Sequence, residues 1–212
     1  ESGRGALRGI YGPVSQLITV KDKYSAAIET ALGAAVQNIV VDNETDAKRA
    51  MGFLKEHRAG RATFLPITAI KGRVLSEQGL DDQYGFVSIA SDLVSYDNKY
   101  SEIIRWLLGR TAVAEDIDSA IAIAKKYSYR FRIVTLDGQV INAGGSMTGG
   151  SRVQNAGILS RGNEIERLKG SLASMQKELD GMLSDYKLLS EDASAAKAEL
   201  EGAEGDLLRA KE

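Results

Sequence analysis

The sequence contains no cysteine, a single histidine and only two prolines among its 212 residues. Without cysteine the chain has no disulfide, no thiolate nucleophile and no cysteine-based metal centre. A lone histidine, His57, cannot complete a zinc cluster or a nucleophile–histidine–acid arrangement. His57 stands beside Arg58 near the predicted end of a helix, which is typical of a solvated surface residue. We therefore expect no catalysis, no metal site and no cofactor.

The chain also has little net charge and no long apolar run. Its formal net charge is -2, so any contact with nucleic acid must be a local basic patch. No apolar run approaches the roughly 20 residues that span a bilayer, and residues 1–8 lack the apolar core of a signal peptide. The absence of cysteine fits a reducing compartment. Both ends look like cuts in a longer chain, and we expect no membrane partner.

Alternating strand and helix signals fill the chain up to residue 142 and predict an α+β fold. The predicted strands cover residues 10–20, 36–41, 62–65, 86–94, 111–114, 131–136 and 139–142. The predicted helices cover residues 22–32, 43–60, 98–108 and 117–127. Residues 68–84 are polar and contain glycine, which indicates a connector. The Asp137-Gly138 pair predicts a tight hairpin turn before the last strand.

Residues 23–33 reappear, in register, as residues 99–109. Lysine, tyrosine, serine, isoleucine, leucine and glycine coincide, and the same order of strands and helices surrounds each copy. Chance similarity between two amphipathic helices is the alternative explanation. Because the element order also repeats, we favour an internal duplication. It predicts two half-domains, residues 9–67 and 85–162, joined by the connector 68–84.

Residues 143–151 carry two glycine pairs directly after the last predicted strand. Glycine allows positive φ and close approach to another surface. The spacing of Gly144 and Gly149 matches a phosphate-binding P-loop, but Gly150 stands where the lysine is required. A dinucleotide-binding loop would lead directly into a helix, whereas residues 152–162 intervene here. We therefore predict that a second chain, rather than a phosphate, approaches these glycines.

Residues 163–212 predict one long helix, in which apolar residues recur at alternating intervals of three and four. This is the seam of a left-handed coiled coil. Its first positions are Ile165, Leu168, Leu172, Met175, Leu179, Met182, Tyr186 and Leu189. One flank of the seam is mostly acidic, so two antiparallel copies would repel each other and a different, basic helix is the expected partner. The alternative, a surface helix of a bundle, fits poorly because the period continues too long.

Basic and aromatic residues interleave between residues 125 and 132, and further arginines stand near the start of the long helix. Such a pattern suits phosphate contacts. The candidates are Lys125, Lys126, Arg130, Arg132, Arg152 and Arg161. The alternative is a solvated helix end that runs into an amphipathic strand.

Several segments together resemble the hinge domain of SMC (structural maintenance of chromosomes) proteins. They are residues 9–18, 26–33, 37–41, 60–66 (Gly-Arg-Ala-Thr-Phe-Leu-Pro) and 144–150 (Gly-Gly-Ser-Met-Thr-Gly-Gly). The likeness extends over residues 9–162 and is strongest to the prokaryotic, homodimeric members. Residues 159–166 resemble the family's transition into its coil.

The resemblance implies a homodimer in which each pseudo-symmetric half-domain meets the opposite half of the partner, largely by strand-edge pairing. The interface residues implied by the motif are Gly144, Gly145, Ser146, Met147, Gly149 and Gly150. Residues 1–8 would be the remnant of an incoming coiled-coil helix that pairs antiparallel with residues 163–212. DNA binding near the junction of hinge and coil is a further property that the resemblance implies.

For the whole protein the resemblance implies a cytoplasmic, nucleoid-associated ATPase for chromosome condensation and segregation. The ATPase heads would lie outside this sequence, and kleisin-type subunits would bind only through those heads. This fragment would then be a non-enzymatic dimerisation module. The alternative from a different class is a nucleic-acid-binding domain that is dimerised by its coiled coil.

Overall fold

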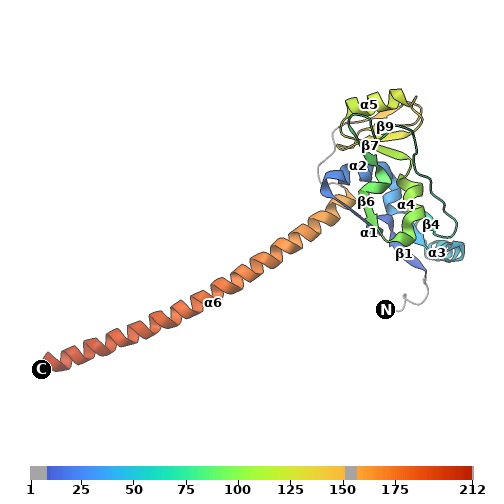
Figure 1. The fold of residues 1–212 in the computed structure, drawn as a ribbon. Coiled ribbons are helices and arrows are strands. Elements are labelled where there is room, and N and C mark those ends of the chain that lie inside the picture. Colours follow the sequence, from blue (N-terminus) through green and yellow to red (C-terminus); the bar gives the residue numbers. More distant parts are fainter. Residues whose placement is uncertain (1–8, 151–156, 212) are drawn as a thin grey trace. The chain divides into compact units, whose positions relative to one another are not determined.

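The computed structural model describes residues 9–150 and 157–211 (Figure 1). The chain divides into a compact unit that ends at Asn163 and a second unit from Glu164 onwards. Each unit is described by itself. All strands of the described residues lie in the first unit.

The first half of the compact unit alternates short strands and helices. Its elements are β1 (Ile10–Pro13), α1 (Val14–Leu17), β2 (Ile18–Val20), α2 (Asp22–Leu32), the 3₁₀ helix η1 (Gly33–Gln37), β3 (Ile39–Val41), α3 (Glu44–Glu56) and β4 (Phe64–Pro66). The connector, residues 68–84, contains no helix or strand.

The second half repeats this order and adds a hairpin at its end. Its elements are β5 (Phe86–Ile89), the 3₁₀ helices η2 (Ala90–Leu93) and η3 (Asn98–Tyr100), β6 (Val94–Tyr96), α4 (Ser101–Leu108), β7 (Thr111–Ala114), α5 (Ile117–Lys126), β8 (Arg132–Thr135), β9 (Val140–Ile141) and β10 (Met147–Thr148). The helix α6 (Ile158–Lys211) follows.

The same kind of cap starts the outer helix of each half. The Asn43 side chain accepts a hydrogen bond from the main-chain N–H of Asp46 (3.0 Å) at the start of α3. Asp116 does the same for Ser119 (2.8 Å) at the start of α5. Such caps satisfy a main-chain donor that the first turn leaves unpaired. The sequence left Asn43 and Thr45 open as the start of this helix, and the structure places the cap at Asn43. The helix ends at Glu56 rather than near Gly60.

The two halves also build matching sheets. The first sheet has the order β1-β3-β4 and the second has the order β10-β9-β8-β7-β5. The β1–β3 and β5–β7 pairs are antiparallel, and the β3–β4 and β7–β8 pairs are parallel. The register even shifts at equivalent places, between Ile10 and Gly12 and between Phe86 and Ser88. The structure therefore repeats in the way that the duplicated sequence predicts.

A third, two-stranded sheet joins the halves. β2 and β6 pair antiparallel, with Thr19 opposite Ser95. These two residues are themselves equivalent in the repeat, because the same interval separates Ile18 from Val94, the first residues of the two strands. A local twofold axis therefore passes through the pair of Thr19 and Ser95.

One hydrophobic core spans both halves and surrounds this axis. It contains residues of α2 and α4 together with residues of β2, β6, β7 and β8. Its most deeply buried large side chains are Val14, Ile28, Val40, Ile103, Ile104, Leu108, Val113 and Val134. Two smaller clusters lie under α5 in the second half and under α3 in the first. Because the main core is shared, neither half buries its apolar surface alone.

The chain that leaves each half packs on the central helix of the other half. The main-chain N–H of Gly72, in the connector, donates to Glu102 of α4 (3.0 Å), and a Cβ at Gly72 would overlap the Arg105 side chain. The N–H of Leu159, at the start of α6, donates to the Glu29 side chain on α2 (3.0 Å). Glu29 and Arg105 are equivalent in the repeat. The connector is thus packed tightly.

Two predicted strands were wrong in the same way. Residues 10–20 and residues 86–94 were each expected to be one strand, but each is interrupted by a short helix, α1 or η2. Each run supplies one strand to the outer sheet of its half and one to the β2–β6 sheet. A bend is therefore needed, and local hydrophobicity does not signal it. The strand predicted over residues 36–41 likewise begins only at Ile39, after η1.

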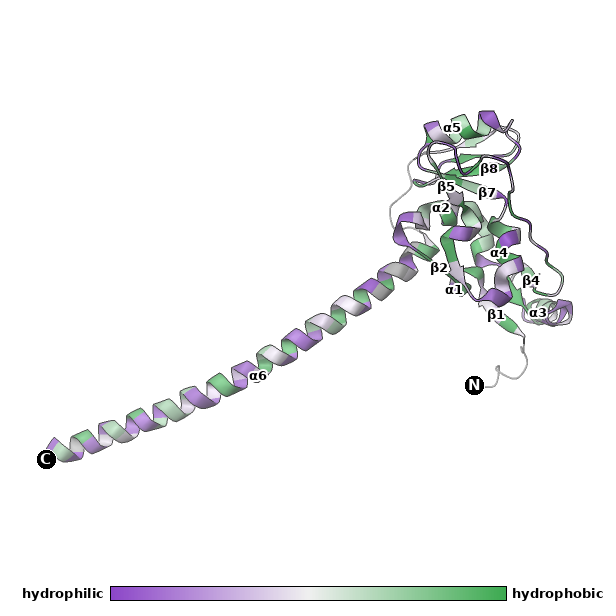
Figure 2. Cartoon of the chain, in the orientation of Figure 1, coloured by the Kyte–Doolittle hydropathy of each residue, from purple (hydrophilic) through white to green (hydrophobic). Residues whose placement is uncertain are grey.

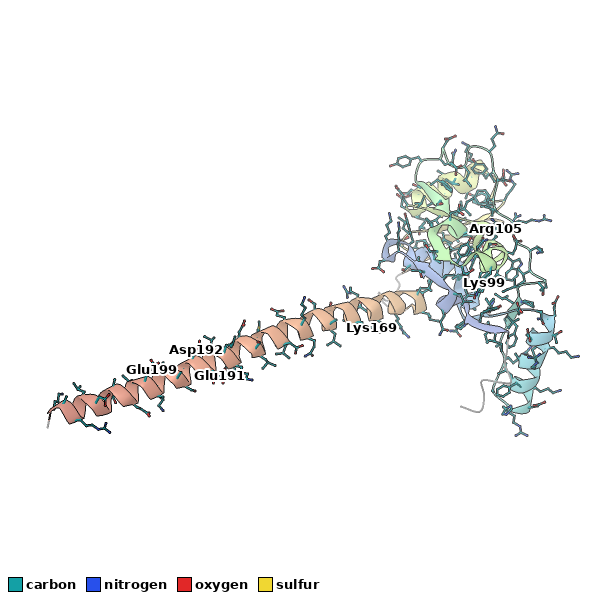
Figure 3. All side chains as sticks on the ribbon, turned by 60° about the horizontal axis from the view of Figure 1, so that its bottom comes forward. Lys99, Arg105, Lys169, Glu191, Asp192 and Glu199 are labelled. Carbon is teal, nitrogen blue, oxygen red and sulfur yellow. The ribbon has the colours of Figure 1, made fainter. Side chains whose placement is uncertain are left out.

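The long helix begins earlier than expected, at Ile158 rather than residue 163, and continues to Lys211. In the second unit the seam residues are exposed, from 49% for Leu179 to 71% for Tyr186. Apolar and polar residues alternate along the helix (Figure 2). Charged side chains such as Glu191, Asp192 and Glu199 stand away from its axis (Figure 3). The seam is therefore an uncovered apolar surface among the described residues.

Arg132 on β8 is a further link between the halves. Its guanidinium donates to the carbonyls of Ala31 (2.9 Å) and Thr30 (3.1 Å), in the last turn of α2. Carbonyls in the last turn of a helix favour a nearby cation. Partial burial lowers the pKa of Arg132 from its ordinary value. The side chain expected to contact phosphate therefore caps a helix of the other half.

We expect Arg132→Leu to lower the free energy of unfolding by about 2 kcal/mol, because two carbonyls lose a charged donor. Urea denaturation of the two proteins measures the change. Arg130→Leu is the matched control, since Arg130 forms an exposed ion pair with Glu77 (2.8 Å). Exposed pairs contribute roughly 0–1 kcal/mol. Equal losses in the two variants would contradict the assigned role of Arg132.

Candidate dimerisation edge

The glycine-rich stretch forms a hairpin at one end of the five-stranded sheet. β10 pairs antiparallel with β9, with Met147 opposite Ile141 and Thr148 opposite Val140. The predicted interface residues, Gly144, Gly145, Ser146, Met147, Gly149 and Gly150, thus lie together on the turn and the outer strand of one hairpin. Ser151 lies outside the described residues.

The first glycine pair shapes the turn of this hairpin. Gly144 and Gly145 have φ values of 86° and 95°, a conformation that favours glycine. The N–H of Gly144 donates to the carbonyl of Tyr129 (2.9 Å), and the N–H of Asn142 donates to the carbonyl of Ser146 (2.8 Å). Replacing either glycine would strain the turn. These two positions therefore have a role within the chain besides any contact with a partner.

The second glycine pair lies beside Gln139. The N–H of Gly150 donates to Gln139 Oε1 (3.1 Å), and Gln139 Nε2 donates to the carbonyl of Gly150 (3.4 Å). A Cβ at Gly149 would overlap the Gln139 side-chain oxygen. Local sequence patterns do not single out Gln139. Knowledge of the register would have placed it opposite Gly149, but the register came only from the structure.

The pattern of hydrogen bonds indicates which main-chain groups of β10 face outwards. The N–H of Asn142 donates to the carbonyl of Ser146, and the N–H of Gly150 donates to the side chain of Gln139, the residue that precedes β9. Residues of an antiparallel strand alternate between bonded and non-bonded pairs. The main-chain groups of Met147 and Gly149 therefore point away from β9. Met147 is 54% exposed, so this edge is open to another strand.

β4 forms an edge of the outer sheet in the first half. It is the last strand of the order β1-β3-β4. The carbonyl of Thr63 and the N–H of Ile67 are bonded towards β3, so the alternating residues Phe64 and Pro66 direct their main-chain groups outwards. Pro66 has no N–H, so the outer edge offers both groups of Phe64 and one carbonyl of Pro66. The sequence did not predict this second edge.

The candidate phosphate contacts do not form one exposed patch. Lys126 donates to the Gln83 side chain (2.8 Å) and Arg130 pairs with Glu77, both in the connector. Arg132 caps α2 as described above. Lys125 and Arg161 are exposed, and Arg152 lies outside the described residues. Contact with nucleic acid stays a prediction, with several of its cations already hydrogen-bonded within the chain.

Other kinds of site find little support in the described part of the chain. Among residues 9–150 and 157–211 no group of three or more histidine, aspartate or glutamate side chains is placed to hold a metal ion. No helix in these ranges is long and apolar enough to cross a membrane. His57 stacks on Phe53, with ring centroids 4.1 Å apart, and its Nδ1 lies 2.9 Å from the Phe53 carbonyl. His57 thus lies at the exposed end of α3.

Residues 7–124 match the family described as the flexible hinge domain of SMC proteins. The chain therefore belongs to the SMC hinge family, as the resemblance indicated. It is 41% identical over 187 residues to the chromosome partition protein Smc of Bacillus subtilis, which covers 86% of this chain and 16% of that protein. The Smc protein of Lactiplantibacillus plantarum is 41% identical over 196 residues, with 89% of this chain and 16% of that protein covered. The chain thus spans a small part of these relatives.

Solved hinge structures have the same fold. An asymmetric dimer of the Geobacillus stearothermophilus SMC hinge domain matches with a TM-score of 0.74 and 47% identity, over 83% of this chain and 72% of that one. The Pyrococcus furiosus SMC hinge domain matches with a TM-score of 0.61 and 33% identity, over 72% of this chain and 79% of that one. The predicted α+β hinge fold followed by a long helix is confirmed.

Asp137, in the turn between β8 and β9, makes a pH-dependent contribution to the stability of the fold. A hydrogen bond from Thr135 lowers the pKa of Asp137 from its ordinary value, and the Gln139 side chain lowers it further. A carboxylate with a lowered pKa in the folded state stabilises that state at neutral pH. This contribution is lost as the pH falls below about 4.

We expect Thr135→Val to raise the pKa of Asp137 towards its ordinary value, because the hydroxyl donor is removed. Titration of the Asp137 carboxyl by NMR measures this directly. Asp137→Asn should destabilise the chain at pH 7, and the difference from the parent should shrink as the pH falls through 4. A difference that stays constant over this range would contradict the assignment.

Proposed function

We propose that this chain is the homodimerisation hinge of a chromosome-partitioning SMC protein and joins two coiled-coil arms. The single observation that carries the proposal is that the last strand of each half-domain lies at an edge of its outer sheet, β10 in one half and β4 in the other. The related hinge of Geobacillus stearothermophilus supports it, since its solved structure is an asymmetric dimer. The names of the full-length relatives describe chromosome partition.

The two edges are suited to each other. Met147 offers an N–H and a carbonyl on the outer side of β10, and Phe64 offers the same two groups on the outer side of β4. Pairing β10 of one copy with β4 of another would satisfy these groups and extend both sheets. Each copy carries one edge of each kind, so a twofold arrangement closes with two such contacts and leaves neither edge open.

Met147 itself suits a contact surface. Its side chain is half exposed in the single chain, and an unbranched thioether side chain adapts to an irregular partner surface. The flanking glycines add no side chain, so a second main chain can approach closely. A solvated edge strand in a monomer is more often protected by charge or by a bulge. Residues 147–150 of this edge contain no charged residue.

The helix α6 would form one strand of a coiled-coil arm. Its seam is exposed over its described length, and one flank carries the acidic residues Glu178, Asp185, Asp192 and Glu199. The partner we propose is the incoming helix of the same chain, antiparallel to α6 and basic at that flank. ATP-hydrolysing heads, the subunits bound to them and a role in chromosome condensation are proposals for the whole protein.

DNA contact is a secondary proposal for this chain. Lys125 and Arg161 are the candidates for this contact, because both are exposed. The competing hypothesis is a nucleic-acid-binding domain that is dimerised only by its coil. The two hypotheses differ in what holds the dimer together, the strand edges or the seam of α6.

We expect Met147→Pro to convert the dimer to a monomer while the fold is retained. Proline removes the outward N–H, and edge strands tolerate proline where that N–H faces away from the sheet. Sedimentation equilibrium measures the mass, and circular dichroism checks the fold. Met147→Leu keeps the N–H and a similar side chain, so it should stay dimeric.

A variant of the seam separates the two hypotheses. Leu168→Glu with Leu172→Glu places charges in the coil and leaves the hinge unchanged. If the coil alone dimerises the chain, this variant becomes monomeric and Met147→Pro stays dimeric. Under the hinge proposal the results are reversed. A Met147→Pro protein that is folded and still dimeric at tens of micromolar would contradict the proposal that the strand edges form the dimer.

A further inference from the structure

Gln139 occupies a position where the β9–β10 ladder loses its main-chain partner. Extending the pairing of Thr148 with Val140 by one residue places Gly149 opposite Gln139, and by two residues places Gly150 opposite Gly138. The N–H of Gly138 is already donated to the carbonyl of Thr135 (2.9 Å) in the preceding turn. The main chain on the β9 side therefore cannot continue the ladder to Gly150.

The Gln139 side chain takes the place of that missing main chain. Its Oε1 accepts from the N–H of Gly150 (3.1 Å), and its Nε2 donates to the carbonyl of Gly150 (3.4 Å). An exchange of one N–H and one carbonyl bond with the same residue is the pattern of a bonded antiparallel pair. A primary amide is the side-chain group that supplies both a donor and an acceptor for this purpose.

The orientation of the amide is fixed by its neighbours. Gln139 Nε2 also lies 3.3 Å from Asp137 Oδ2, and an ionised carboxylate can only accept. Asp137 in turn accepts from the Thr135 hydroxyl, and this hydroxyl accepts from the main-chain N–H of Gln139 (2.8 Å). Thr135 is fully buried. The amide is therefore held by a short network anchored in the core.

The second glycine pair fits this arrangement. A Cβ at Gly149 would overlap Gln139 Oε1, so any larger residue would displace the amide. Gly150 has a φ of 144°, within the range that favours glycine. The geometry of the chain itself therefore requires glycine at both positions. The amide pulls Gly150 towards β9, so Met147 and Gly149 keep their main-chain groups directed outwards.

We propose that Gln139 is a positioning residue for dimerisation, which holds residues 147–150 in the register that the partner's strand requires. The inference rests on the proposed hinge function. Gln139 need not touch the partner. It acts through Gly150, because an edge strand that is already extended loses less conformational freedom when a second copy binds.

The test compares three variants of the full chain. Gln139→Met keeps the length and volume of the side chain and removes both hydrogen bonds. Gln139→Asn keeps the amide on a side chain that is one methylene shorter, so it cannot reach Gly150. Gln139→Glu keeps the acceptor and loses the donor, and its charge lies beside Asp137. We expect each variant to raise the Kd of the dimer about tenfold or more, with Gln139→Glu the weakest binder at pH 7.

A second measurement separates positioning from a general loss of stability. In the monomeric Met147→Pro background, the exchange rate of the Gly150 amide proton is measured by NMR with and without Gln139→Met. Positioning predicts that Gly150 loses its protection while amides of the core, such as that of Val134, keep theirs. Loss of protection across the whole sheet would overturn the proposal, since Gln139 would then be a general stabilising residue.

The failure of this proposal differs from a failure of the proposed function. If Met147→Pro abolishes the dimer but Gln139→Met leaves its Kd unchanged within twofold, the hinge stands and Gln139 has no positioning role. If Met147→Pro remains dimeric, the edge is not the interface and both proposals fall. If both variants weaken the dimer and Gly150 alone loses protection, the positioning role is supported.

Discussion

The antiparallel pairing of β2 with β6 is the interaction on which the rest of this hinge depends. It places two equivalent strands face to face and brings α2 and α4 into one shared core. Each half uses the other to bury its apolar surface, and the segment that leaves each half packs on the other half's central helix. In each outer sheet the last strand along the chain, β4 or β10, lies at an edge. In this architecture the internal symmetry builds the shared core, whereas the two edges proposed to join two copies differ, because β4 belongs to the repeat and β10 to the hairpin that only the second half carries.

Glycine has different physical roles within residues 144–150. Gly144 and Gly145 adopt positive φ in a hairpin turn, whereas Gly149 lies where a side chain would displace Gln139. A role in close approach to a second chain is compatible with both, but the chain's own geometry already requires them. Basic residues show a similar division. Arg132 and Arg130 are held by internal partners, so the number of cations in a segment overstates what it offers to phosphate.

Much of the fold could be predicted because it depends on local patterns. Asn43 and Asp116 are strong helix caps, and the recurrence of residues 23–33 as residues 99–109 indicates the duplication. The two strand predictions that failed, residues 10–20 and 86–94, failed because each run serves two sheets. A continuous apolar run does not reveal which sheet each residue joins. Gln139 escaped prediction for the same reason, since its role depends on a strand register.

The sequence by itself determined the family, the duplication, the turn at Asp137-Gly138 and the coiled-coil seam, because spacing and residue type encode each of these directly. Only the tertiary structure decided where the open edges lie, that β4 is the second of them, and which cations are already bonded within the chain. These properties depend on residues far apart in sequence, such as Arg132 and Thr30, that come together through the shared core. Local sequence patterns do not predict such long-range contacts.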